Sequence, residues 1–255
     1  MDADTCLLFM GDEGSQTAEM SSSLNTANDD LDSRGTFDAA TPIILWKHAG
    51  TEVAIEQQAN VLSDTAALVW METLVACHWL AKTERVTSSV PPLGAALDLG
   101  AGTGFLGCWV SLHGLCTTMT ISDRPIRMPY IRRNIDRNHL ASPKTTALGL
   151  NWGDVKAARA LRNKFDVIFA SSLIYDPGNH EALIATLEAL AAPRILLVFA
   201  RRHEAHEESF LNLLRKNYET ELKLREEEPL RGNEVFIFDC SHRDSAATPA
   251  HRSHK

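Results

Sequence analysis

The stretch "LDLGAGTGFLG", residues 97–107, decides how the rest of the chain is interpreted. An apolar run leads into it and another leads out, which predicts a strand, a tight glycine turn and a helix. Its second half, "GTGFLG", fits the G-x-G-x-x-G pattern of dinucleotide-binding loops. Its first half places Asp98 ahead of three alternating glycines, which are Gly100, Gly102 and Gly104.

Strand-like and helix-like patterns alternate on both sides of this stretch. Strands are expected at 95–100, 117–122, 145–150, 165–170 and 194–200, and helices at 105–113, 127–138, 155–163, 179–191 and 204–217. Two further strands, 219–228 and 233–240, follow without a helix between them. The pattern predicts an α/β fold: a doubly wound, mostly parallel seven-stranded sheet that ends in a C-terminal antiparallel hairpin.

The segments before and after this core have different compositions. Residues 1–40 are polar and acidic and are expected to be a disordered tail. Within 41–94 we expect a hairpin at 43–57 and an amphipathic helix at 65–83, both packed on the core of residues 95–240. Residues 241–255 are expected to form a flexible tail.

The charge distribution and the cysteine spacing argue against a nucleic-acid-binding protein and against a metalloprotein. The acidic tail holds nine acidic residues against one arginine, which accounts for the whole net charge of −8, and the remaining acids and bases balance. A nucleic-acid partner is therefore not expected. The five cysteines show no metal-ligand spacing, so no metal is expected. No signal peptide or membrane span is visible, and we expect a monomer in the cytoplasm, with the nucleus as the alternative.

The glycine turn is expected to hold a ligand that carries positive charge. A dinucleotide would require Asp98 to lie inside a buried strand or close to a pyrophosphate, and both placements are unfavourable for a carboxylate. S-adenosylmethionine instead presents a sulfonium and an ammonium group that a carboxylate at the mouth of the strand can attract. Asp123, at the end of the next strand, can accept hydrogen bonds from ribose hydroxyls, although dinucleotide folds share that feature.

At these residues the chain resembles the seven-β-strand S-adenosylmethionine-dependent methyltransferases, within them the protein-lysine branch of the methyltransferase-like group. The resemblance spans roughly residues 43–240. It rests on "AALVW", "LDLGAGTGFLG", "SDRPIRMPYIRRNIDRN" with Asn134 and Asn138, "LNWGD" and "FDVIFASSLIYD".

The resemblance implies roles for particular residues. The methionine end of the cofactor would contact Asp98, Gly100, Ala101, Gly102 and Gly104, and Asp123 would hold the ribose. Trp152 would lie against the adenine, Ser171 would line the floor, and Trp70 would close the site from the N-terminal side. A role for Trp152 is also expected without the resemblance, because an indole on a short loop can stack on a purine. The alternative is a tryptophan of the hydrophobic core.

One motif departs from this family. Its lysine methyltransferases usually carry an acidic residue, two apolar residues and an aromatic one after the fourth strand of the parallel sheet. This chain has Ser172-Leu173-Ile174-Tyr175, so Tyr175 keeps the aromatic position and Ser172 replaces the acid. Asp176 could substitute for the acid, or it could cap a turn. The arginines of residues 124–137 could follow a phosphate backbone, although a solvated helix face is the simpler interpretation.

These observations favour an S-adenosylmethionine-dependent methyltransferase that acts on a protein lysine side chain, with Ser172 and Tyr175 as the candidate catalytic residues. Two alternatives stay open. One is a binding or scaffold protein that keeps the fold and has weak or no turnover. The other is a methyltransferase of small-molecule amines.

Overall fold

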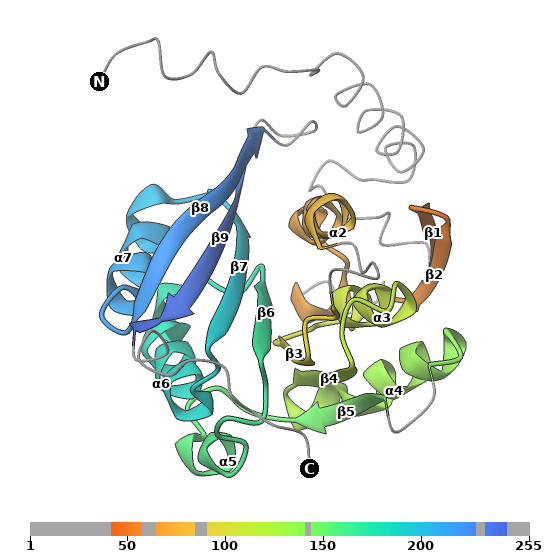
Figure 1. Ribbon diagram of the computed structural model, residues 1–255, viewed down its shortest axis with the longest axis horizontal. Coiled ribbons are helices and arrows are strands. Elements are labelled where there is room, and N and C mark those ends of the chain that lie inside the picture. Colours follow the sequence, from red (N-terminus) through yellow and green to blue (C-terminus); the bar gives the residue numbers. More distant parts are fainter. Residues whose placement is uncertain (1–41, 58–64, 85–90, 141–143, 228–232, 244–255) are drawn as a thin grey trace.

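The computed structural model describes residues 42–57, 65–84, 91–140, 144–227 and 233–243. The acidic tail expected at 1–40 lies outside these residues. Within them a seven-stranded sheet crosses the molecule, with helices on both of its faces (Figure 1). Its strands, in spatial order, are β5 (Thr145–Gly149), β4 (Thr118–Asp123), β3 (Ala95–Leu99), β6 (Val167–Ser171), β7 (Arg194–Ala200), β9 (Glu234–His242) and β8 (Tyr218–Glu227).

The predicted topology of this sheet is confirmed. The first five strands of that order pair in parallel, whereas β9 pairs antiparallel with both β7 and β8. The strand order reverses between β3 and β6, because the chain runs outward from β3 to β5 and then returns to the other side of β3. In an open sheet of this kind, ligands bind at the carboxyl ends of the strands beside that reversal.

Alternate residues of the central strands belong to two separate hydrophobic clusters, one on each face of the sheet. In β7, for example, Leu196 and Val198 belong to the first cluster, and Ile195 and Leu197 to the second. The first face is covered by α2 (Met71–Thr83), α3 (Phe105–Leu112) and α4 (Met128–Arg137). The second is covered by α5 (Val155–Ala160), α6 (His180–Leu190) and α7 (Glu204–Leu214). Burial on both faces explains why these strands are continuous apolar runs.

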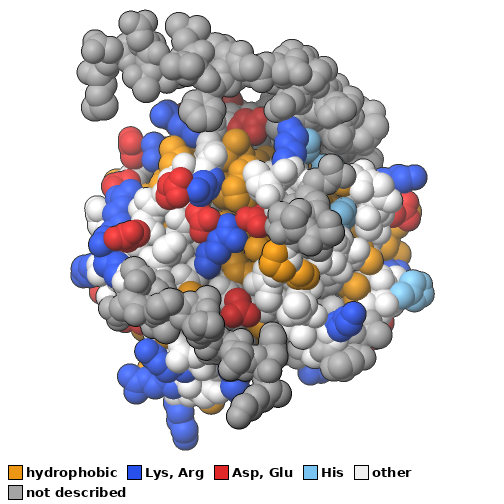
Figure 2. All heavy atoms as spheres, viewed as in Figure 1, with side chains coloured by type: hydrophobic (Ala, Val, Ile, Leu, Met, Phe, Trp, Pro, Cys, Tyr) orange, Lys and Arg blue, Asp and Glu red, His pale blue; other side chains and the backbone are white. Residues whose placement is uncertain are grey.

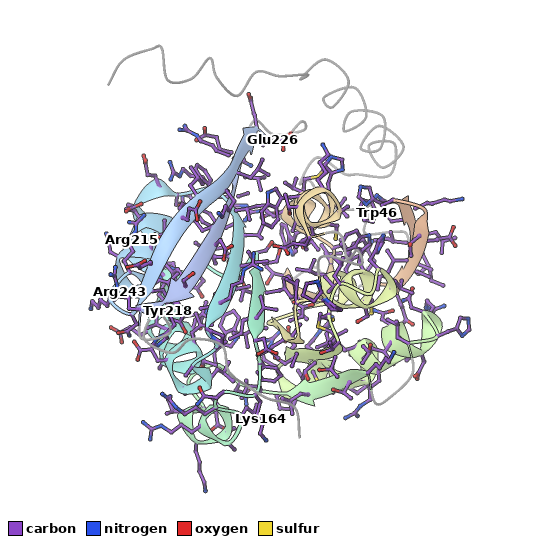
Figure 3. The ribbon with its side chains drawn as sticks, viewed as in Figure 1. Trp46, Lys164, Arg215, Tyr218, Glu226 and Arg243 are labelled. Atoms are coloured by element: carbon purple, nitrogen blue, oxygen red, sulfur yellow. The ribbon has the colours of Figure 1, made fainter. Side chains whose placement is uncertain are left out.

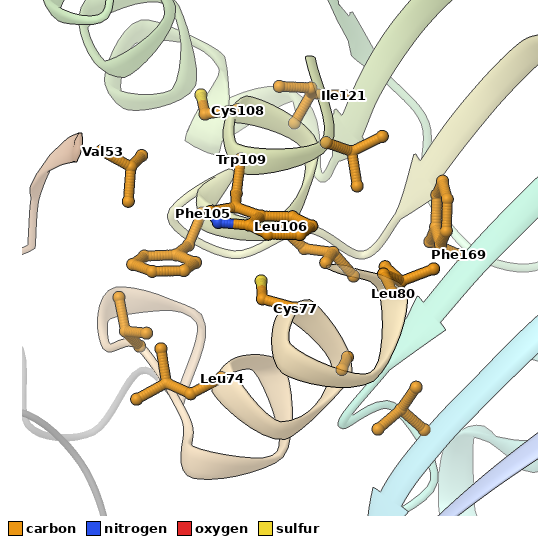
Figure 4. Packing of buried hydrophobic residues seen from close by; sticks show 14 of the residues in the cluster. Val53, Leu74, Cys77, Leu80, Phe105, Leu106, Cys108, Trp109, Ile121 and Phe169 are labelled. Carbon is orange, nitrogen blue, oxygen red and sulfur yellow. The ribbon is translucent and has the colours of Figure 1, made fainter. Parts of the chain in front are cut away.

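A separate antiparallel hairpin, β1 (Ile43–His48) and β2 (Thr51–Glu56), packs outside the first layer of helices (Figure 1). Its inward side chains, including Trp46 and Val53, join the cluster that contains Phe105 and Trp109 of α3. Figure 4 shows Val53, Phe105 and Trp109 in the same layer as Cys77 of α2. Trp46 in this hairpin and Tyr218 in β8 lie on opposite sides of the molecule (Figure 3).

Two predicted boundaries are wrong. The helix expected at 65–83 begins only at Met71, because residues 65–67 form a separate 3-10 turn (η3, Thr65–Ala67) and Trp70 is extended, with φ −103° and ψ 149°. Tertiary contacts of this turn, described below, outweigh its helical pattern. The tail expected to begin at 241 overlaps the sheet, because β9 continues to His242, whose N–H donates to the carbonyl of Pro193. The rest of that end lies outside the described residues.

The surface carries charges of both signs. On the face shown in Figure 2, lysine and arginine side chains are interspersed with aspartate and glutamate. None of the helices in the described ranges has the length and apolar character required to span a membrane.

Candidate active site

A cavity of about 520 Å³ opens at the carboxyl ends of the parallel strands, beside the reversal of strand order. This volume lies within the range of small-molecule sites, roughly 300–1,000 Å³. With one exception, every residue predicted for the site lines the cavity: Trp70, Asp98, Gly100, Ala101, Gly102, Asp123, Trp152, Ser171, Ser172 and Tyr175. The exception is Gly104, which begins α3 as its N-cap, with φ 80°.

The glycine turn has a backbone shape that other residues rarely adopt. Gly100, Gly102 and Gly104 all have positive φ, at 65°, 59° and 80°. A Cβ on Gly100 would lie 2.7 Å from both Leu173 and Trp152, so the turn also passes too close to its neighbours for a side chain. The absence of a Cβ therefore allows the turn to pack directly against Trp152 and Leu173.

Asp98 lies inside β3 and is only 2% exposed. The expectation that it stands at the mouth of the strand, clear of the buried segment, is wrong. The burial is tolerated because Oδ2 accepts a hydrogen bond of 2.9 Å from the N–H of Gly107 on α3. A Cβ on Gly107 would lie 3.0 Å from that oxygen, so the last glycine of the motif allows the helix to approach the carboxylate.

Burial raises the pKa of Asp98 from 3.8 to about 7, against the lowering effect of the Gly107 hydrogen bond. The nearby Asp123 adds a smaller contribution in the same direction. A cationic ligand beside Asp98 would favour the ionised form and bring this pKa down again. The cavity therefore contains a carboxylate whose charge near neutral pH depends on what binds next to it.

Asp123 ends β4 and connects that strand to the glycine turn. Its Oδ2 accepts from the N–H of Gly102 at 2.8 Å, and its Oδ1 accepts from the N–H of Arg124 at 2.7 Å. Burial also raises the pKa of Asp123, while both of these hydrogen bonds lower it. Because each carboxylate oxygen has two lone pairs, both remain able to accept from a ribose diol.

Two tryptophans line the cavity. Trp152 is half-buried on the turn after β5 and lies against Gly100. Trp70 precedes α2, and its Nε1–H donates to the carbonyl of Thr65 at 2.9 Å. The guanidinium of Arg202 lies 5.2 Å from the centre of the Trp70 ring and forms an ion pair of 2.6 Å with the buried Glu72. Trp70 is thus fixed on two sides.

The end of the cavity nearest β6 is lined by hydroxyl groups. The Oγ of Ser171 lies 3.2 Å from Oγ1 of Thr73, and the Oη of Tyr175 lies 2.9 Å from Oγ1 of Thr65. Ser172 adopts the left-handed conformation with φ 61°, and its buried Oγ has no hydrogen-bond partner among the described residues. A buried hydroxyl left without a partner is unfavourable, which is consistent with a ligand group completing its hydrogen bonding.

Asp176 does not substitute for the acid that is absent at Ser172. Its two oxygens accept from the N–H of Gly178 at 2.9 Å and from the side chain of Asn179 at 2.7 Å, so it caps the short η5 turn (Pro177–Asn179). Of the described residues that line the cavity, Asp98 and Asp123 are the only carboxylates. The part of the cavity near Ser172 and Tyr175 therefore has no carboxylate of its own.

Three arginines of the basic stretch at 124–137 contact other parts of the protein. Arg127 is 3% exposed and donates to the carbonyl of Ala66 at 2.8 Å. Arg133 and Arg137 both pair with Glu56, at 2.9 and 3.1 Å. These contacts hold η3 and the hairpin against α4. In the described ranges, no cluster of three histidine, cysteine or acidic side chains could hold a metal ion.

Sequence reasoning missed the contribution of the turn before α2. Thr65 and Ala66 line the cavity, and a Cβ on Gly102 would lie 3.1 Å from the Ala66 carbonyl. The turn therefore covers the glycine loop directly. Its only local signal is "AALVW" with Trp70, because its partners at Arg127 and Tyr175 lie far away in the chain.

A family model described as lysine methyltransferase matches residues 47–217. Among curated proteins, the chain is 26% identical over 205 residues to EEF1A lysine methyltransferase 3 of Mus musculus, covering 79% of this chain and 83% of that one. It is 27% identical over 182 residues to the protein N-lysine methyltransferase METTL21A of the same organism, covering 69% and 79%.

Solved structures show the same fold at much lower sequence identity. TYW2 of M. jannaschii, in complex with AdoMet, superposes with a TM-score of 0.52 at 12% identity, covering 79% of this chain and 87% of that one. TYW2 of P. horikoshii, in complex with MeSAdo, gives a TM-score of 0.51 at 15% identity, covering 78% and 71%. At these identities the likeness extends to the fold alone.

Proposed function

The chain belongs to the lysine methyltransferase family, and from this premise we propose how its cavity is used. It is an S-adenosylmethionine-dependent methyltransferase of the protein-lysine kind. We propose that the cofactor occupies the end with the carboxylates, between Asp98, Asp123 and Trp152, and that the acceptor lysine reaches it past Tyr175. The observation that carries this assignment is one cavity that is lined both by the carboxylates of Asp98 and Asp123 and by the hydroxyl groups of Ser172 and Tyr175.

The residues at the first end match the chemistry of the cofactor group by group. The carboxylate of Asp98 suits the cationic methionine end, and the two oxygens of Asp123 suit the ribose diol. The indole of Trp152 offers a flat face to the adenine. The close approach of the Gly100 backbone keeps Trp152 and Leu173 in place along the cavity, because a Cβ there would collide with both of them.

When bound, the cofactor supplies a methyl group that its sulfonium already activates. What the protein contributes is alignment of the lysine nitrogen with that methyl and exclusion of water. Attack on that methyl would require the lysine amine to be neutral. A free lysine has a pKa of ~10.4, so its ammonium must lose a proton to the solvent on entry.

The neutral acceptor end favours that proton loss. Desolvation among hydroxyl and apolar groups lowers the pKa of a lysine, whereas a carboxylate would hold the ammonium and raise it. The unpartnered Oγ of Ser172 can accept a hydrogen bond from the amine, and the 42% exposed ring of Tyr175 can pack beside the lysine stem. These two residues are the ones we assign to the acceptor.

Tritiated methyl transfer into a cell lysate tests this function. Wild-type protein and labelled S-adenosylmethionine should label discrete protein bands, with mass spectrometry placing the methyl groups on lysine. Radioactivity confined to the small-molecule fraction would instead support an amine substrate. Binding of the cofactor with no labelled product would favour a protein that keeps the fold without turnover.

We also propose that the chain acts as a monomer on a protein substrate in the cytoplasm, with the nucleus as the alternative. The charges of the core balance, and Arg133 and Arg137 of α4 pair with Glu56, which supports a protein substrate over a nucleic acid. Gel filtration with light scattering would measure the mass, and cell fractionation would test the compartment.

A further inference from the structure

Two asparagines of α4 form the same pair of hydrogen bonds with one edge of the hairpin. Asn134 accepts from the N–H of Glu56 at 2.7 Å and donates to its carbonyl at 3.0 Å. Asn138 accepts from the N–H of Ala54 at 2.8 Å and donates to its carbonyl at 2.7 Å. Ala54 and Glu56 are two residues apart, so both present their backbone groups to the same edge of β2. The two amides therefore bind this edge as a neighbouring strand would.

The two asparagines differ in the partner of their remaining N–H. Asn134 donates a second hydrogen bond of 2.8 Å to the carbonyl of Thr103, whereas Asn138 donates to the carbonyl of Asn134 in its own helix, at 2.7 Å. Thr103 is 3% exposed, lies between Gly102 and Gly104, and lines the cavity. Only the Asn134 amide thus connects the hairpin directly to the glycine turn.

The peptide that joins Thr103 to Gly104 is held by a hydrogen bond on each side. The N–H of Gly104 donates to the carbonyl of Ala101 within the turn, at 2.8 Å, and the carbonyl of Thr103 accepts from Asn134. This carbonyl is buried and would be left unpaired without Asn134, which is unfavourable. Asn134 is itself fully buried, and both of its N–H groups are engaged.

We propose that Asn134 is a positioning residue for the cofactor, which holds the Thr103 peptide in place and couples the glycine turn to the β1–β2 hairpin. The inference rests on the proposed function, because it takes the glycine turn as the cofactor site. The proposal assigns a role to Asn134, the first residue of the "NIDRN" motif, which does not itself line the cavity. By reciprocity, binding at the turn must stabilise the contact with the hairpin.

The pair Asn134→Asp and Asn138→Asp tests this assignment. Each variant places a carboxylate against carbonyls of β2, so both should lower the melting temperature. Only Asn134→Asp also faces Thr103, and its affinity for S-adenosylmethionine, measured by calorimetry with folded protein, should fall at least tenfold. Asn138→Asp should change it less than threefold. Equal changes in affinity would overturn the proposal.

Amide exchange in the wild-type protein gives a second test that needs no folded variant. Adding S-adenosylmethionine should slow exchange of the Glu56 amide, which bonds to Asn134, at least fivefold more than exchange of the Ala54 amide, which bonds to Asn138. Equal protection of the two amides, measured by NMR, would overturn the coupling. If wild-type protein fails to bind the cofactor at all, the proposed function falls instead, so the two failures are distinguishable.

Discussion

The two ends of the cavity differ in the charge of the side chains that line them. At the cofactor end, Asp98 and Asp123 are buried carboxylates, and backbone N–H groups accompany each of them. At the acceptor end, Ser172 and Tyr175 offer neutral hydroxyls. The first end can therefore attract positive charge and the second can discourage it. The difference suggests that a protonated lysine gains little by entering this site, whereas a cationic cofactor gains a charge partner.

The largest expected effect comes from adding a side chain to the glycine turn at the charged end. Gly100→Ala would place a Cβ 2.7 Å from Leu173 and Trp152, at a φ of +65°. We expect affinity for S-adenosylmethionine to fall at least a hundredfold, about 2.7 kcal/mol, in a calorimetric titration. The cause is that the added Cβ must displace Trp152, Leu173 or the turn itself, and all three line the cavity.

Gly114→Ala provides the matched control for that change. Gly114 has nearly the same φ, +63°, and nothing lies within 4 Å of its expected Cβ. Both variants therefore carry the backbone strain, and only Gly100→Ala displaces residues that line the cavity. If the two lose affinity equally, backbone strain and global destabilisation explain the effect, and the cavity is not the cofactor site.

Removing the charge of Asp98 should have the next largest effect. We expect Asp98→Ala to weaken cofactor binding at least tenfold, ~1.4 kcal/mol or more, because the cationic ligand loses its carboxylate partner. Asp98→Asn is the matched variant, since its amide oxygen can still accept from Gly107. Unchanged affinity in a folded Asp98→Asn would show that the charge is irrelevant.

The pH dependence of binding should follow from the raised pKa of the same group. With a pKa of about 7 in the free protein, Asp98 must release a proton to face a cation, so affinity rises as the pH rises. Between pH 6 and 7.5 we expect a gain of about eightfold in calorimetric affinity, accompanied by proton release. Asp98→Asn should abolish this slope; an identical slope would assign the proton to another group.

The raised pKa of Asp98 also makes the stability of the free protein depend on pH. The folded-state pKa of Asp98 lies above its unfolded value of 3.8, so folding takes up a proton between pH 4 and about 7. Its contribution to stability is therefore lost as the pH rises through this window. The melting temperature of the wild type should fall relative to that of Asp98→Asn over the same range.

Sequence alone revealed the charged end much better than the neutral one. The parallel strands are continuous apolar runs, and such strands carry their functional groups at their carboxyl ends, so Asp123 could be placed from local pattern. The burial of Asp98 could not, because it depends on how closely α3 packs at Gly107. A hydrogen bond between parts of the fold that are not adjacent leaves no periodic signal.

The acceptor end depends even more on distant contacts. Thr65 and Tyr175 meet across 110 residues of sequence, and the 3-10 turn that carries Thr65 lies where the periodicity predicts a helix. The left-handed conformation of Ser172 is equally invisible in sequence, since serine has no preference for it. Asp176, by contrast, stands beside a proline and caps a turn, which local chemistry predicts well.

The smallest expected effect comes from making the neutral end resemble the charged one. Ser172→Asp restores the acid that the family usually carries, and aspartate tolerates the left-handed backbone at this position. The carboxylate should lower the KM for the acceptor protein but raise the pKa of the bound lysine, so the two effects oppose each other. We expect kcat/KM to be retained or raised by up to about threefold, the scale of one partly exposed ion pair.

Ser172→Asn, which has the same shape without the charge, should leave the pH profile of kcat unchanged, whereas Ser172→Asp should shift it upward. Complete loss of activity in Ser172→Asp, with cofactor affinity intact, would mean that the acceptor nitrogen is not held beside Ser172 and that the charge difference between the two ends does not serve catalysis.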